Sequence, residues 1–145
     1  MLILEQEPMF GSRRTATRAL ALASLAFLVA GCGEGPSAPL AQFQPEVTNA
    51  TDSFQAQATG VNGVSGTVSY RWVNTGTRAT INHSTTTRGG SVTLTIRDAA
   101  NTVVYARALS PSLNEPTTVG VSGTWTLQLT TDNYAGTMNF RVQKL

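Results

Sequence analysis

The sequence predicts an all-β fold: an antiparallel β-sandwich of about seven or eight strands, preceded by an N-terminal leader and a flexible tether. Three observations predict it. Apolar and polar residues alternate with a period of two in successive runs between residues 46 and 145, as in strands with one face on a core and one in water. Turn-forming residues separate the runs, and no stretch after Cys32 has the 3.6-residue period of a helix. The short turns favour antiparallel pairing.

The first element is a leader of the secretory type. A basic stretch, Arg13 to Arg18, precedes an uncharged run from Ala19 to Ala30, which ends in small residues at Gly31 and Cys32. This is the layout of a signal peptide, with a positive start, an apolar centre and a small-residue cleavage site. A transmembrane helix needs about 20 apolar residues, and this run is shorter. We therefore expect residues 1–31 to be a cleaved signal peptide.

The start of translation is open between Met1 and Met9. Glu5 and Glu7 precede Met9 and do not suit the positive start of a signal peptide. We expect translation to begin at Met9.

The end of the leader, Val29-Ala30-Gly31-Cys32, resembles the bacterial lipobox. The resemblance implies cleavage between Gly31 and Cys32, transfer of diacylglycerol to the Cys32 thiol, and acylation of the new amino group. Two or more acyl chains give stable membrane anchoring, where one gives marginal binding. Cys32 is the only cysteine, so no internal disulfide is expected. Gly33 after the cysteine, by the sorting rule of such lipoproteins, favours the outer membrane.

Residues 32–45 form the next element, a lipidated cysteine and a tether rich in Gly, Pro, Ser and Ala. The domain is expected over 46–145. The ten basic residues less the three leader arginines leave seven, and the eight acidic residues less Glu5 and Glu7 leave six. This near-neutral part lacks the dense basic face that a nucleic-acid binder needs, so no nucleic-acid partner is expected.

Alternation predicts the strands of the domain. The Val103 to Leu109 segment is strand-like with an ambiguous inward face, since Val103/Tyr105 and Val104/Ala106 both fit. The other predicted strands are centred on residues 54–59, 68–72, 79–82, 92–97, 119–121 (a weak segment), 125–129 and 138–143. Turns are predicted at residues 61–63, 74–76, 88–90, 98–101 and 132–136, which are rich in Gly, Asn and Asp.

Two stretches of the domain, Val92 to Arg107 and Gly123 to Val142, resemble the end of bacterial pre-peptidase C-terminal domains. The shared features are a strand, an Asp-containing turn and a strand, followed by a Gly-Thr-aromatic strand and a final hairpin. The resemblance implies a jelly-roll sandwich, with an immunoglobulin-like sandwich as the alternative arrangement. It supports the fold and carries no function.

Candidates for chemistry are few. His83 is the only histidine and falls in a polar run, so we interpret it as an exposed loop residue without triad partners. Asp98 with Asn101, and Asp132 with Asn133, offer oxygen ligands but are also standard turn residues, so no metal site is expected. No catalytic residue and no cofactor are expected.

Aromatic residues give the remaining binding hint. Trp72 and Trp125 fall on predicted inward faces and are expected in the core. Tyr134 falls in a predicted turn and is the best exposed candidate for a ligand contact.

The sequence therefore predicts an exported protein anchored to the bacterial cell envelope by lipid on Cys32, at the periplasmic or outer face of an outer membrane. The domain is expected to be a non-catalytic binding, adhesion or structural module whose partner is an envelope protein or a glycan. A carbohydrate-binding module is the first alternative, and a hydrolase is the second.

Overall fold

A computed structural model describes residues 45–109 and 112–145, and every regular element in them is a β-strand. The chain order is β1 (Glu46–Ala50), β2 (Ser53–Asn74), β3 (Ala79–His83), β4 (Thr86–Arg97), β5 (Val103–Ala108), β6 (Leu113–Pro116) and β7 (Gly123–Lys144). All pairings are antiparallel. The predicted all-β, antiparallel, sandwich-like fold is confirmed.

The leader, the lipobox with Cys32, and the tether were predicted on residues that lie almost wholly outside the described part of the chain. Within residues 45–109 and 112–145, no helix is long and apolar enough to span a membrane.

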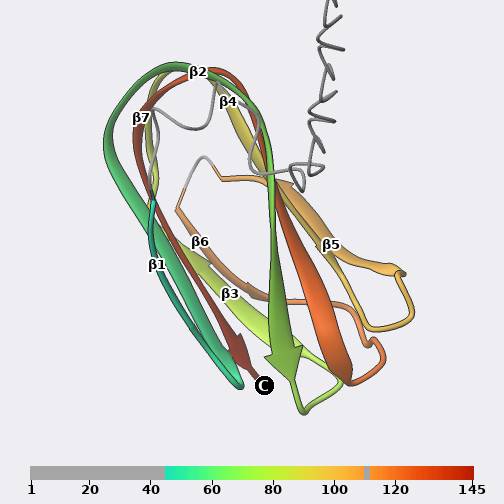
Figure 1. Ribbon diagram of the computed structural model, residues 1–145. Helices are drawn as coiled ribbons and strands as arrows, with labels where there is room; N and C mark the ends of the chain where they lie inside the picture. Colours follow the sequence, from blue (N-terminus) through green and yellow to red (C-terminus); the bar gives the residue numbers. More distant parts are fainter. Residues whose placement is uncertain (1–44, 110–111) are drawn as a thin grey trace, which may run out of the picture. The chain divides into compact units, whose positions relative to one another are not determined.

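The fold is built on two long strands, β2 and β7, of 22 residues each. Strands of ordinary domains have about 3–10 residues, so strands of this length must bend to stay on one core. Both bend near their middles, and β4 bends beside them, so that a single sheet folds over on itself (Figure 1). One layer then contains β1, the first half of β2, the second half of β7, β3 and β6. The other contains the remaining halves of β2 and β7 with β4 and β5.

Three of the predicted turns lie in the bend, and the structure corrects them. The register of β2 against β7 shifts three times between Ala58 and Gly66, and that of β4 against β7 shifts between Thr87 and Ser91. Residues 61–63, 88–90 and 132–136 were predicted as chain-reversing turns, but they are bulged corners inside continuous strands. Glycine and asparagine supply the positive φ angles that bulges need as well as those of turns, so composition alone does not separate the two.

One glycine shows how tight the corner is. Gly90 in β4 has a φ of 65°, and a Cβ there would collide with the backbone oxygens of Asp132 and Asn133 in β7. Only glycine combines this backbone angle with such a close approach of two strands.

The remaining connections follow prediction more closely. The turns at 74–76 and 98–101 do link consecutive strands. The weak strand predicted at Val119 and Val121 is wrong, because both residues lie in an exposed loop; β6 forms at Leu113–Pro116 instead. The ambiguous segment of β5 buries both Val104 and Tyr105, because a register shift between Ile96 and Arg97 turns two consecutive side chains inward.

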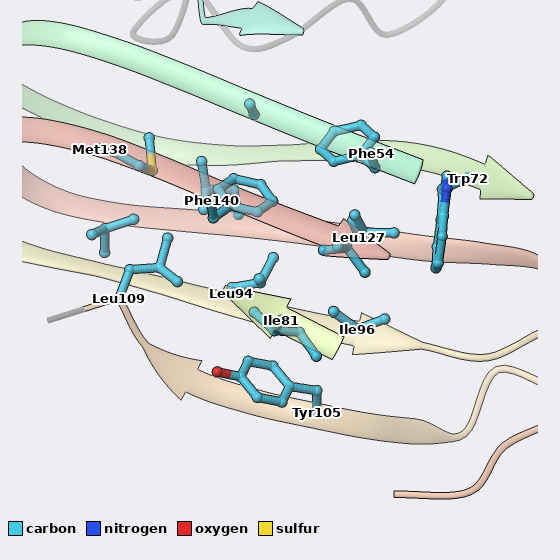
Figure 2. Packing of buried hydrophobic residues seen from close by; sticks show 14 of the residues in the cluster. Phe54, Trp72, Ile81, Leu94, Ile96, Tyr105, Leu109, Leu127, Met138 and Phe140 are labelled. Carbon is cyan, nitrogen blue, oxygen red and sulfur yellow. The ribbon is translucent and has the colours of Figure 1, made fainter. Parts of the chain in front are cut away.

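The core lies between the layers and is rich in aromatic residues (Figure 2). Trp72 and Trp125 are fully buried, as predicted, and pack edge to face with ring centroids 5.8 Å apart. Each indole N–H donates to a backbone carbonyl, Trp72 to Ala50 at 3.0 Å and Trp125 to Val121 at 2.7 Å. Both tryptophans therefore combine apolar burial with a satisfied polar atom.

Candidate functional site

A cluster of ionisable side chains lies on the side of the core formed by β3, β5 and β6. His83 ends β3, whose alternation also buries Ala79 and Ile81. Glu115 in β6 pairs with Ile81, so its side chain takes the same inward side of the layer. Tyr105 comes from β5 in the opposite layer, and its hydroxyl points toward Leu109 (Figure 2). Three strands thus bring His83, Tyr105 and Glu115 to one edge of the core, here called the polar edge.

The polar edge has unpaired polar atoms. His83 is 2% exposed and Tyr105 is 6% exposed. Within the described residues, neither imidazole nitrogen of His83, nor the Tyr105 hydroxyl, nor Glu115 Oε1 has a hydrogen-bond partner. Arg107 Nε lies 3.3 Å from Glu115 Oε1, an ion pair at the rim without hydrogen-bond geometry. Buried polar groups are bonded in the large majority of cases, so these atoms are exceptional.

Burial sets the charge states here. Desolvation lowers the pKa of His83, while the charge of Glu115 and the backbone of Leu109 oppose that shift. Desolvation also raises the pKa of Tyr105, and the neighbouring Glu115 carboxylate adds to the effect. Both rings are therefore neutral at neutral pH, and a general acid or base role would need a solvent path to a substrate.

His83 was predicted to be an exposed loop residue, and this is wrong. The residue continues the alternation of Ala79 and Ile81, which the polar run after Asn82 hid at the sequence level. Pairing with Phe140 in β7 and Leu113 in β6 then encloses it.

Tyr134 was predicted to be exposed in a turn and therefore available to a ligand. The structure corrects this premise, because its side chain is 0% exposed. The hydroxyl donates a hydrogen bond of 3.3 Å to the carbonyl of Thr86 across the corner. The buried positions of β7 are odd-numbered up to Thr131 and even-numbered from Tyr134 onward, because the bulge at Asp132 and Asn133 shifts the alternation by one residue and turns Tyr134 inward.

Asp98 accepts hydrogen bonds that stabilise the turn between β4 and β5. In the sequence, this turn role was the alternative to a role as a calcium ligand. One carboxylate oxygen accepts from the amides of Ala100 and Thr102, and the other accepts from the amide of Val121 at 2.8 Å. Burial opposes ionisation of Asp98, but these three amides together hold its pKa below the ordinary value. Among the described residues, no group of three or more His, Cys, Asp or Glu side chains is placed to hold a metal ion.

A second aspartate, Asp52, was not singled out by sequence. It lies in the turn between β1 and β2, where both its oxygens accept from Thr75 and one also accepts from Lys144 Nζ at 2.7 Å. The hydrogen bonds from Lys144 and Thr75 lower the pKa of Asp52 to about 2. Its partner is 92 residues away in the chain, so no local pattern could have revealed the contact.

The proposed lipidation residue, Cys32, and the lipobox residues Val29, Ala30 and Gly31 lie outside the described residues. Their role stays a prediction.

No protein-family model matches the sequence, and no curated protein matches it. Among solved structures, the chain is similar to a chain in the structure of the infectious bursal disease virus Gx strain, with 12% identity and a TM-score of 0.23. The match covers 70% of this chain and 32% of the viral chain, so this chain spans about a third of the viral chain's length. Similarity this low carries no argument about function.

Proposed function

We propose that the protein is a lipoprotein of the bacterial envelope, whose β-sandwich domain is a non-catalytic binding or structural module. The observation that carries this proposal is the order of features in residues 9–45. Three arginines, an uncharged run, a lipobox that ends at Cys32 and a Gly- and Pro-rich tether follow one another directly. A folded β-domain then begins at Glu46.

The placement of the ionisable residues supports a non-catalytic role. His83 is the only histidine and is closed inside the core, and Asp98 is bound by three backbone amides. A nucleophilic hydrolase needs a base in contact with both a nucleophile and a substrate. Burial of His83 therefore favours the binding module over the hydrolase alternative.

The aromatic residues that the sequence offered to a carbohydrate-binding module are not exposed in the structure. Trp72, Trp125 and Tyr134 are all fully buried, so none of them offers a stacking platform for a sugar ring. Any recognition of a glycan by this domain would use the polar outer faces of the sheet.

The anchoring proposal is tested by expressing the wild type, Cys32→Ala and a tether control, Ser37→Ala, in a bacterial host. We expect the wild type and the control to incorporate labelled fatty acid and to sediment with membranes, and Cys32→Ala to do neither. Membrane retention of Cys32→Ala equal to that of the wild type would contradict the proposal.

The side of the membrane is read from the same cells by protease shaving. Degradation of the domain on intact cells would place it on the surface and favour adhesion or capture. Protection until the outer membrane is opened would place it in the periplasm and favour a role in envelope structure.

A further inference from the structure

The outer face of the layer that contains β4 and β5 is dominated by hydroxyl side chains. Here it is called the hydroxyl face. Its members alternate with buried core residues in β4 and β7 and with the partly buried Val68 and Tyr70 in β2, so they lie on the outer side of the sheet. The hydroxyl face consists of Thr67, Ser69 and Arg71 from β2, Thr93, Thr95 and Arg97 from β4, and Thr124, Thr126, Gln128 and Thr130 from β7.

Two arginines of this face stand in one cross-strand row. Arg71 and Arg97 both pair with Thr126, one from each neighbouring strand. Adjacent strands are about 4.8 Å apart, so the two arginine Cα atoms are separated by roughly 10 Å with the Thr126 hydroxyl between them. Side chains as long as arginine can converge on one anion above Thr126.

Neither arginine is neutralised within the described residues. The ion pairs there join Arg107 with Glu115 and Lys144 with Asp52. Asp98 follows Arg97 directly but is buried, with its carboxylate bound to backbone amides. Arg97 donates one bond, from Nη1 to the carbonyl of Asn101 at 3.2 Å, and its other donors stay available. The row therefore has two positive charges without an acidic partner.

The neighbouring row of side chains indicates which other chemical groups the ligand would have. Ser69, Gln128 and Thr95 form the next outward row, because Gln128 pairs with both of the others. Their hydroxyl and amide groups donate and accept hydrogen bonds, as sugar hydroxyls require. A phospholipid surface is a poorer fit, because binding to an anionic membrane typically uses a cluster of about four to eight basic residues and this row has two arginines. The exposed apolar side chains beside them are small, with Val73 on β2 and Val103, the partner of Arg97, on β5.

We propose that the hydroxyl face binds an acidic polysaccharide, with a sugar carboxylate held between Arg71 and Arg97 above Thr126 and sugar hydroxyls on the Ser69–Gln128–Thr95 row. Arginine suits this role because its planar guanidinium bonds a carboxylate through two parallel N–H donors. The inference rests on the proposed function as a binding module and names its ligand class.

The test uses the full mature protein in non-ionic detergent, with polygalacturonate as the probe and its fully methyl-esterified form as the uncharged control polymer. We expect the wild type to bind polygalacturonate with an affinity that falls as salt rises, and to bind the ester much less. Arg71→Gln and Arg97→Gln should each weaken binding about tenfold, the loss expected for one charge-assisted hydrogen-bonded contact. The matched control is Arg141→Gln, which removes an exposed arginine from the opposite layer.

Three outcomes would overturn the proposal. They are equal binding of the acid and the ester, equal weakening by Arg141→Gln, and arginine-dependent binding to phosphatidylglycerol vesicles without binding to polygalacturonate. Circular dichroism of each variant checks that the fold is retained. Failure here is distinguishable from failure of the anchoring proposal, because fatty-acid labelling at Cys32 does not depend on Arg71 or Arg97.

Discussion

The two sides of the core differ in how their polar atoms are satisfied. On the side of the tryptophans, between the paired halves of β2 and β7, both indole N–H groups donate to carbonyls and the rings pack edge to face. At the polar edge, His83 and Tyr105 are almost as deeply buried but have no hydrogen-bond partner among the described residues. Burial alone therefore does not measure stabilisation, because an unpaired polar atom in the core keeps its desolvation cost.

The largest expected effect breaks the tryptophan side. Trp125→Ala should lower the free energy of unfolding by about 3–5 kcal/mol, because it leaves a large cavity and removes the ring that Trp72 packs against. Urea unfolding followed by circular dichroism measures the change. Gln128→Ala, an outward position on the same strand, is the control and should shift the value by less than about 1 kcal/mol. A similar small shift for Trp125→Ala would show that this side does not dominate stability.

A smaller effect tests the corner that joins the layers. Gly90→Ala should destabilise by about 2 kcal/mol or more, since a non-glycine residue in the left-handed region costs about 1–2 kcal/mol before any collision with β7 is counted. Gly89→Ala is a close control, because a Cβ at Gly89 meets no atom within 4 Å. Equal unfolding midpoints for the two variants would contradict the bulged corner.

At the polar edge, a substitution is expected to leave the free energy of unfolding unchanged or to raise it, whereas the two substitutions above lower it. His83→Leu should leave the protein equally stable or stabilise it by about 1 kcal/mol, because it removes two unpaired nitrogens and keeps the volume filled. Asn82→Ala, on the outward side of the same strand, serves as the control. A loss of 2 kcal/mol or more in His83→Leu, on the scale of a broken buried hydrogen bond, would mean that His83 has a partner in solution.

The pH dependence of stability also tests the burial of His83. Because the folded-state pKa of His83 is lowered, the unfolded chain takes up a proton first as the pH falls below about 6.5. The wild type should therefore lose stability relative to His83→Leu as the pH is lowered through that value toward the folded-state pKa. The charge of Glu115, which is itself paired with Arg107 and lies beside Tyr105, raises the pKa of His83 and so moderates the effect. Parallel stability curves for the two proteins between pH 8 and pH 5 would show that His83 titrates normally.

The smallest effect concerns the surface at Asp52. Lys144→Met removes its strongest hydrogen bond, so the pKa of Asp52 should rise from about 2 toward the ordinary 3.8. Carboxyl chemical shifts followed by NMR during an acid titration measure this directly. An unchanged pKa would assign the shift to Thr75 alone.

The sequence was sufficient for the strands whose alternation is clean. Val92, Leu94 and Ile96 are buried as predicted, and so are Trp72 and Trp125. It was insufficient at the corners, because the Gly and Asn residues that mark bulges there also mark turns, and Tyr134 was misplaced for that reason. Strand β6 was missed because its four residues include a proline and show no alternation.

The polar edge and the hydroxyl face could not be predicted from the sequence, for a different reason. Each joins residues from three strands, and their proximity depends on the register of non-consecutive strands. Arg71, Arg97 and Thr126 come together only because β2 and β4 flank β7. A period of two predicts which side of a strand each residue faces, but it does not predict the neighbouring strand.

Lipid anchoring at Cys32 is tested most directly by mass spectrometry of the mature protein extracted from bacterial membranes. We expect an N-terminal peptide that begins at Cys32, with diacylglycerol on the thiol and an acyl chain on the amino group. A mature protein that begins elsewhere, or an unmodified thiol at Cys32, would contradict the lipoprotein assignment on which the proposed function rests.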